Sequence, residues 1–246
     1  MTMTNIVIVG ATSAIARALA ERFINGASFV LVARDADRLR AIAADLTIRG
    51  ARAAHVVQAD LAEMSDHVRV VHETCAAMPS IDLVVIAHGV LPDQARCDAD
   101  VDYAMATWML NADSVASLMH RFVNLLIEQG RGTAVVISSV AGDRGRASNY
   151  TYGAAKAAVT AYASGLRTRA AAHGVHVITV KPGFVDTPMT SHLKKNPLFA
   201  SAGHVAGDIA RAIARGSATV YTPWFWRPIM SVIKALPERI FGKLRA

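Results

Sequence analysis

Cysteine is scarce in this chain, and a long uninterrupted apolar run is absent. Cys75 and Cys97 are the only cysteines among 246 residues, and neither has the His or Cys neighbours of a metal site. The sequence therefore predicts neither a disulfide framework nor a bound metal, and it indicates a reducing compartment. No stretch reaches the ~18 uninterrupted apolar residues of a membrane-spanning helix. No basic region precedes the first expected strand, as it would in a signal peptide. We expect a cytoplasmic location.

The charge lacks any concentrated block. The net charge is +7, but the sequence contains no Lys/Arg cluster and no basic stripe interleaved with aromatic residues. Nucleic acid is therefore not expected as a partner, whereas a phosphorylated ligand or an anionic membrane surface fits the charge. Apolar residues make up 53% of the chain, and Gly and Pro are not in excess, which favours a folded core over disorder.

Short β-branched runs alternate with longer Ala-rich stretches. Continuous apolar strands separated by helices indicate a parallel sheet covered on both faces. We predict an α/β fold with a doubly wound, mostly parallel sheet of the Rossmann type. It forms one catalytic domain over residues 1–222, followed by a short amphipathic tail over 223–246. The expected strands are 6–9, 29–33, 54–58, 83–87, 134–138, 176–180 and 219–221, and the expected helices are 14–24, 36–48, 66–77, 101–129, 150–172 and 204–215.

The first strand runs into a turn of small residues that opens a helix. Backbone N–H groups and the helix dipole at such a turn bind a pyrophosphate. Only Gly10 of the usual glycine fingerprint is present, with Ala14 and Ala16 where further glycines are expected, so a plain strand–helix connection is the alternative. The residues of this turn predicted to bind a dinucleotide are Gly10, Thr12, Ser13 and Ile15.

The second strand ends at Ala33 and Arg34 instead of at an acid. An NAD site often places a carboxylate there for the ribose 2′-hydroxyl. Arg34 suits the 2′-phosphate of NADP, although Asp35 beside it and an ordinary exposed helix-start arginine argue the other way. We expect NADP(H), with NAD(H) as the alternative. Further along, Asp60 and Leu61 are expected to border the adenine, and Ala87 and Gly89 to approach the ribose, with His88 as a loop histidine between them.

Tyr152 and Lys156 stand four residues apart and follow Ser139, which closes the expected strand 134–138. Residues at i and i+4 share one helix face. A phenol has a pKa of about 10, and a neighbouring ammonium stabilises the phenolate and lowers that pKa toward the working range. The carboxyl end of a parallel strand is the usual place for α/β chemistry. This spacing predicts an enzyme.

Together these motifs resemble the short-chain dehydrogenase/reductase family over about residues 5–222. The matching motifs are the Gly10 turn, Asp60, Ala87-His88-Gly89, Asn111, Ser138 to Gly142, Tyr152 with Lys156, and Lys181-Pro182-Gly183. The resemblance implies that Tyr152 transfers the proton and that Lys156 lowers its pKa and binds the nicotinamide ribose. It also implies that Ser139 holds the substrate carbonyl and that Asn111 supports a water relay. The residues implied to line the nicotinamide are Pro182, Gly183, Val185 and Thr187.

Four stretches resemble more narrowly the reductases that act on decaprenylphosphoryl-2-keto-erythro-pentofuranose. They are 87–93, 141–149, 181–193 and 221–244. This resemblance implies a polyprenyl-phosphate-linked 2-keto pentose as substrate, a flavin-dependent oxidase as partner, and a role in cell-envelope synthesis. A reductase of a soluble ketone or a 3-ketoacyl group is the alternative. A nucleotide-binding regulator without catalysis is a third reading, which the intact catalytic set disfavours.

Basic residues flank the expected substrate site. Arg144 and Arg146 lie between Ser139 and Tyr152, and His192, Lys194 and Lys195 follow the Pro182-Gly183 motif. Guanidinium groups bind phosphate well, so a grip on a lipid phosphate is one reading and a solvated basic surface is the other.

The tail combines aromatic and basic residues. Trp224, Phe225 and Trp226 are followed by apolar residues interleaved with Lys and Arg. This pattern suits the membrane interface, which would place the enzyme peripherally on the inner face of the membrane. Packing on its own domain or on a partner subunit of a homodimer or homotetramer is the alternative.

Overall fold

A computed structural model describes residues 4–242. Its centre is a parallel sheet of seven strands in the order β3-β2-β1-β4-β5-β6-β9. The strand order reverses between β1 and β4, which is where ligands bind in open α/β sheets. The predicted fold class is confirmed. The strands are β1 (Asn5–Val9), β2 (Ser28–Ala33), β3 (Ala53–Gln58), β4 (Leu83–Ile86), β5 (Gly132–Ile137), β6 (Val175–Pro182) and β9 (Thr219–Thr222).

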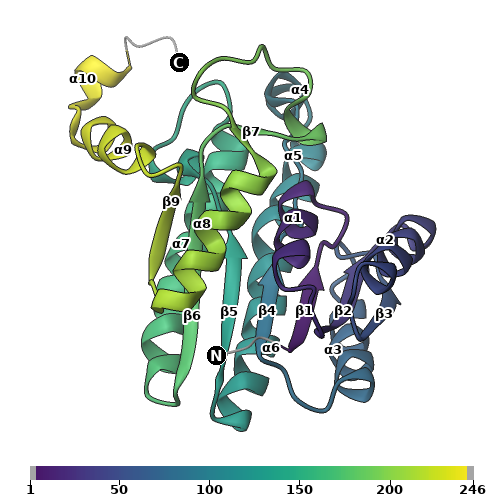
Figure 1. The fold of residues 1–246 in the computed structure, drawn as a ribbon. Coiled ribbons are helices and arrows are strands. Elements are labelled where there is room, and N and C mark those ends of the chain that lie inside the picture. Colours follow the sequence, from purple (N-terminus) through teal and green to yellow (C-terminus); the bar gives the residue numbers. More distant parts are fainter. Residues whose placement is uncertain (1–3, 243–246) are drawn as a thin grey trace.

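Helices cover both faces of the sheet, as Figure 1 shows. One face packs against α1 (Ala14–Arg22), α2 (Ala36–Ile48) and α8 (Ala202–Arg215). The other packs against α3 (Asp66–Ala77), α6 (Ser114–Gln129) and α7 (Tyr150–Ala171). All six residues of β2 are buried, which explains why the strands read as continuous apolar runs and not as alternating ones.

The stretch 101–129 is not the single helix that the sequence predicts. It divides into α5 (Val101–Trp108), a π-helical turn η1 (Met109–Asp113) and α6. The side chain of buried Asn111 donates to the Thr107 carbonyl at 3.1 Å and to the Val90 carbonyl at 3.0 Å. A π-turn of this kind widens a helix locally and often marks a functional position. Apolar periodicity continues through it, so the break could not be predicted from the sequence.

A short helix before α5 was also not predicted. It is α4 (Gln94–Ala99), and Asp93 and Asp100 begin α4 and α5 by accepting backbone N–H bonds at Ala95 (2.9 Å) and Tyr103 (3.0 Å). Each carboxylate satisfies donors that a helix start leaves unpaired.

A second, two-stranded sheet lies above the carboxyl ends of the main strands. Its strands, β7 (Val185–Asp186) and β8 (Ala200–Ser201), enclose a loop that contains the 3₁₀ turn η3 (Pro188–Thr190). The hydroxyl of Thr190 bonds the Val185 carbonyl and so ties this loop to β7. Strands of two residues carry no periodic signal, which is why the sequence did not predict them.

The tail packs on the domain. Its helices are α9 (Trp226–Ala235) and α10 (Glu238–Phe241), at the same end of the sheet as β7 and α4 (Figure 1). Trp226 and Met230 are buried in a small cluster with Val140 of the 3₁₀ turn η2 (Val140–Asp143). Within residues 4–242, no helix has both the length and the hydropathy needed to cross a bilayer. The tail residues 243–246 lie outside the described part.

Candidate active site

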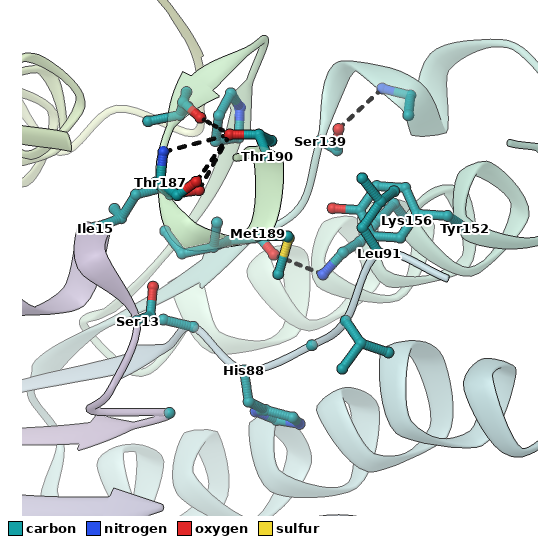
Figure 2. Close-up of a pocket in the computed structure, with 18 of the residues that line it drawn as sticks. Ser13, Ile15, His88, Leu91, Ser139, Tyr152, Lys156, Thr187, Met189 and Thr190 are labelled. Atoms are coloured by element: carbon teal, nitrogen blue, oxygen red, sulfur yellow. Dashed lines mark hydrogen bonds between the residues drawn. The ribbon is translucent and has the colours of Figure 1, made fainter. Parts of the chain in front are cut away.

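A cavity of about 1220 Å³ opens at the carboxyl ends of the strands. It is lined by the turn after β1, the ends of β2, β4 and β5, the start of α7, the loop after β6, and Trp226 of the tail. Figure 2 shows Ser13, Ile15 and Thr187 on the left, Ser139, Tyr152 and Lys156 on the right, and Met189 and Thr190 between them. The cavity is large enough for a dinucleotide and a substrate together.

The turn after β1 depends on Gly10. Its φ is +82°, in the region that favours glycine. A Cβ there would lie 2.5 Å from the His88 backbone nitrogen, so only glycine lets the β1 and β4 turns approach this closely. Ser13 precedes α1 and makes no side-chain cap bond, which leaves the first N–H groups of the helix open toward the cavity. This cradle fits a pyrophosphate.

Two arginines line the end of the cavity beyond β2. Arg34 was predicted; Arg38, one turn into α2, was not. Asp35, the acid that argued against NADP, caps α2 by accepting the backbone N–H of Arg38 at 3.0 Å. Its carboxylate is therefore engaged at the helix start, and Asp35 is not among the residues that line the cavity.

Gly89 lies close to two other predicted site residues, Asn111 and Lys156. A Cβ on Gly89 would lie 2.6 Å from Asn111 Oδ1 and 3.5 Å from Lys156 Nζ, and its φ is +146°. Asn111 Oδ1 accepts the Val90 N–H at 2.9 Å. Asn111 thus fixes the 89–90 backbone but does not itself line the cavity. The water relay implied for it stays a prediction.

His88 lines the cavity but points its ring toward α6 (Figure 2). Its Nε2 lies 3.0 Å from Ser114 Oγ, and that hydroxyl contacts the Leu61 carbonyl. Burial, with a smaller effect from the Lys156 charge, lowers the pKa of His88 to about 3. The imidazole is therefore neutral, and its hydrogen bond joins the β4 turn to α6.

Ser139 lines the cavity beside Tyr152. Its Oγ accepts the Ala141 backbone N–H at 3.1 Å, and its side chain also hydrogen-bonds that of Tyr152. Ser138 beside it faces the other way and bonds the Lys156 carbonyl (3.0 Å) and Thr160 Oγ1 (2.8 Å). Ser138 therefore holds α7 against β5, whereas Ser139 directs its hydroxyl into the cavity.

Tyr152 and Lys156 lie on one face of α7, as their spacing predicts. Lys156 Nζ lies 5.6 Å from the Tyr152 ring centroid and donates to the Ile137 carbonyl at 3.1 Å. Burial raises the pKa of Tyr152 to about 12, partly opposed by the Ser139 side chain. Burial lowers the pKa of Lys156 to about 8. In the protein without cofactor, the loss of water around the Tyr152 phenol outweighs the attraction between phenolate and ammonium that its spacing from Lys156 predicts.

The lysine burial has a consequence for stability. A pKa lowered from 10.5 to about 8 corresponds to roughly 3 kcal/mol, since each pKa unit is about 1.4 kcal/mol. The unfolded chain holds the proton more tightly than the folded one. This cost is therefore present in full below pH 8, and the stability of the fold rises as pH increases from 8 toward 10.5. The buried Lys156 ammonium therefore lowers the stability of the fold at neutral pH.

The structure brings most of the predicted site residues into this one cavity. Those that line it are Gly10, Thr12, Ser13, Ile15, Arg34, Asp60, Leu61, Ala87, Gly89, Ser139, Arg146, Tyr152, Lys156, Pro182, Gly183, Val185, Thr187 and His192. Their individual roles remain predictions.

The structure does not place Arg144 where it could bind a substrate phosphate in the cavity, as the sequence predicts. Its guanidinium donates to the carbonyls of Ile233 (2.7 Å) and Leu236 at the end of α9 and pairs with Glu238 at 2.9 Å. It also lies 4.0 Å from the Phe241 ring centroid. Arg144 therefore holds the tail and does not line the cavity. Lys195 pairs with Asp186 at 2.7 Å on the surface, and Lys194 is not among the lining residues either.

Several lining residues were not predicted from the sequence. Besides Arg38 they include Leu91, Asn149, Phe184, Met189 and Trp226. Trp226 belongs to the tail, and nothing in its sequence context shows that α9 returns to the active site. Arg38 had a usable signal, since it stands four residues after Arg34, in the first turn of the predicted helix 36–48.

No group of three or more His, Cys, Asp or Glu side chains in residues 4–242 is arranged to hold a metal ion.

A doubly wound sheet with Ser, Tyr and Lys around a dinucleotide-sized cavity is typical of nicotinamide-dependent oxidoreductases. The family model described as short chain dehydrogenase matches residues 4–198. An uncharacterized oxidoreductase of Mycobacterium tuberculosis is 38% identical over 241 residues, which is 97% of this chain and 96% of that protein. The chain belongs to the short-chain dehydrogenase family and is an oxidoreductase.

Two further similarities are informative. An acetoacetyl-CoA reductase of Allochromatium vinosum is 32% identical over 135 residues, 55% of each chain. A solved short-chain dehydrogenase from Sphingobium yanoikuyae in complex with NADPH superposes with a TM-score of 0.83 at 23% identity, over 99% of this chain and 97% of that one. At this identity the superposition supports the fold.

Proposed function

We propose that this enzyme reduces a carbonyl to an alcohol with NADPH, and that its substrate is the 2-keto group of a polyprenyl-phosphate-linked pentose. The observation that carries the reaction is the placement of Ser139, Tyr152 and Lys156 around one cavity with a dinucleotide cradle. NADPH supplies the hydride when it is bound. The protein orients the carbonyl and supplies the proton.

Each catalytic side chain has a distinct task in this proposal. The O–H of Ser139 donates to the carbonyl oxygen as negative charge grows on it, which stabilises the transition state more than the ground state. The Tyr152 phenol, protonated at neutral pH because its pKa is about 12, gives its proton to that oxygen. The Lys156 ammonium offsets the charge left on the phenolate, and its remaining N–H groups serve the ribose hydroxyls.

Arg34 and Arg38 are expected to favour NADPH over NADH. A charge-assisted bond to the 2′-phosphate is worth ~10–100-fold. Arg34→Ala should lower kcat/KM for NADPH by about that factor and leave kcat/KM for NADH within about twofold. Arg40→Ala is the matched control, because Arg40 pairs with Asp37 on α2 outside the cavity. A clear preference of the unmodified enzyme for NADH would refute this assignment.

The substrate proposal rests on the residue pattern of the loops around the site and on one structural feature. Residues of the segment 187–193 and Trp226 of the tail line the cavity, where Arg146 and His192 supply basic groups. The exposed face of the tail retains Trp224, Val232 and Ile240. Apolar residues among basic ones suit a membrane surface, and a polyprenyl substrate stays in the membrane. A flavin-dependent oxidase that makes the ketone, and assembly as a homodimer or homotetramer, belong to the same proposal.

A comparison of substrates tests this proposal. With NADPH, we expect kcat/KM for the polyprenyl-phosphate-linked 2-keto pentose to exceed that for cyclohexanone and for acetoacetyl-CoA by at least ~100-fold, because only the first carries the ketone on a sugar ring that is joined through a phosphate to a lipid. Acetoacetyl-CoA is included because the similarity to an acetoacetyl-CoA reductase supports a ketoacyl substrate as the second candidate. A higher kcat/KM for acetoacetyl-CoA would decide for that candidate.

A further inference from the structure

Gly183 lies directly against the tail, and the indole of Trp226 occupies the space that a side chain at position 183 would need. A Cβ on Gly183 would lie 1.9 Å from Nε1 and 2.0 Å from Cε2 of Trp226. Carbon atoms pack at about 3.5–4.0 Å, so no side chain fits there while the indole is in place. Gly183 does not have a positive φ. Its backbone conformation therefore does not demand glycine, whereas the contact with Trp226 does.

The segment from Thr222 to Trp226 holds Gly183 from two directions. The Gly183 N–H donates to the Thr222 carbonyl at 3.1 Å, where β6 pairs with β9. Four residues later Trp226 begins α9, and its indole covers the position of the missing Cβ. The start of the tail thus contacts Gly183 through both a backbone hydrogen bond and a side chain.

Packing alone fixes the indole, because its buried Nε1–H has no hydrogen-bond partner within residues 4–242. Phe184 lies edge-on to Trp226 with ring centroids 5.7 Å apart. Trp226 shares a buried cluster with Met230 and Val140. Arg144 bonds carbonyls at the other end of α9, so the helix that carries the indole is held at both ends.

The backbone that contacts this indole forms part of the cavity wall. Residues 182–185 line the cavity, and so do Trp226 and Val140, which follows Ser139 in the chain. Groups that react must meet at about 3–3.5 Å, and a displacement of about 1 Å can cost ~100-fold in rate. The position of this wall therefore bears directly on the reaction.

We propose that Trp226 is a positioning residue for the active site. Its indole, seated where Gly183 has no side chain, fixes the wall formed by residues 182–185, so the tail is part of the catalytic structure. The inference rests on the proposed carbonyl reduction, in which this wall faces the nicotinamide. The competing explanation is that position 183 is glycine only to leave room for the cofactor.

A double-mutant cycle separates these explanations. Gly183→Ala should lower kcat by ~10–100-fold, because the added methyl group meets the indole and displaces the wall. Trp226→Ala should lower kcat by ~10-fold, because the wall loses its support. In the Trp226→Ala background, Gly183→Ala should change kcat by less than about twofold, since the group that it would strike is gone.

The assay is NADPH oxidation with the ketone that has the highest kcat/KM in the substrate comparison. The Kd of NADPH should stay within about threefold at one NADPH per chain, because the Gly10 turn and Arg34 are unchanged, so a loss of kcat does not reflect unfolded enzyme. Gly145→Ala is the matched control and should leave kcat within about twofold. A Cβ on Gly145 has no neighbour within 4 Å, and Gly145 does not line the cavity.

Two kinetic results would overturn the proposal. One is an equal loss from Gly183→Ala in both backgrounds, which would show that a bound molecule and not the indole needs the room. The other is a Trp226→Ala variant that binds one NADPH per chain and turns over within about twofold of the unmodified enzyme.

Spectroscopy decides the case in which Trp226→Ala does not fold. The chain has three tryptophans, so ¹⁵N-labelled tryptophan gives three indole N–H signals. Trp108→Phe and Trp224→Phe assign two of them and leave that of Trp226. Gly183→Ala should move the Trp226 signal without any ligand, whereas Gly145→Ala should not. In the unmodified enzyme NADPH should move it, whereas 2′,5′-ADP, which lacks the nicotinamide half, should not.

These signals need no turnover, so they separate the positioning role from the reaction. If they move as expected while no ketone is reduced, the positioning role stands and the proposed reaction fails. If ketones are reduced but neither NADPH nor Gly183→Ala moves the Trp226 signal, the positioning role alone is refuted.

Discussion

Tyr152→Phe is expected to lower kcat for carbonyl reduction by at least ~10³-fold, while the affinity for NADPH stays within about threefold. The substitution removes the only proton that the proposed chemistry transfers from the protein, and general acid catalysis contributes ~10²–10⁴-fold. The loss should fall on kcat because the proton moves only in the transition state. The measurement is NADPH oxidation at 340 nm with a saturating ketone, together with a fluorescence titration of the cofactor.

Tyr150→Phe is the matched control for that result. Tyr150 stands two residues earlier on α7, is 47% exposed and donates its hydroxyl to Asp98 at 2.8 Å. It lies outside the cavity, so its loss should leave kcat within about twofold. If Tyr152→Phe kept near-normal turnover, the proton donor would have to be another group, and the roles of Ser139 and Lys156 would fall with it.

The relative placement of the catalytic residues could be predicted from the sequence. Helical spacing alone places Tyr152 and Lys156 on one face, and the end of an apolar strand locates Ser139. These are local relations, so they survive without knowledge of tertiary packing. The electrostatics were not local. The spacing shows only the Lys156 charge beside Tyr152, whereas in the fold burial raises the pKa of Tyr152 to about 12.

The substrate side of the site could not be read in the same way. Arg144 and Arg146 are two residues apart in one loop, and nothing in the sequence distinguishes them. In the structure Arg144 bonds carbonyls at the end of α9, whereas Arg146 lines the cavity. The difference arises because α9, some 80 residues further along the chain, returns to this loop. A contact between such distant segments leaves no periodicity in either of them.

Asp143→Ala is expected to destabilise the fold by about 3–5 kcal/mol, the usual cost of stranding one member of a buried ion pair. Asp143 ends η2 and pairs with Lys181 of β6, and these side chains are 3% and 8% exposed. Its other oxygen accepts the Tyr221 hydroxyl of β9 at 2.8 Å. Burial and the adjacent carboxylate raise the pKa of that phenol, so it stays protonated and able to donate. Without Asp143, a buried ammonium and a phenol lose their shared partner.

This network also joins the segment that carries Ser139 to two strands of the sheet, so its loss should lower kcat/KM as well as the melting temperature. For a chain of this size, ~1 kcal/mol corresponds to about 2–4 °C in Tm, which predicts a drop of roughly 6–20 °C by calorimetry. Asp45→Ala, which breaks a surface pair with Arg49, is the control and should leave Tm nearly unchanged. The double variant Asp143→Leu with Lys181→Met should recover most of the stability, because it replaces the pair with apolar side chains and leaves no buried charge. If Asp143→Ala unfolds at the temperature of the unmodified enzyme, or if the double variant is no more stable than Asp143→Ala, the ion pair does not hold η2 against the sheet.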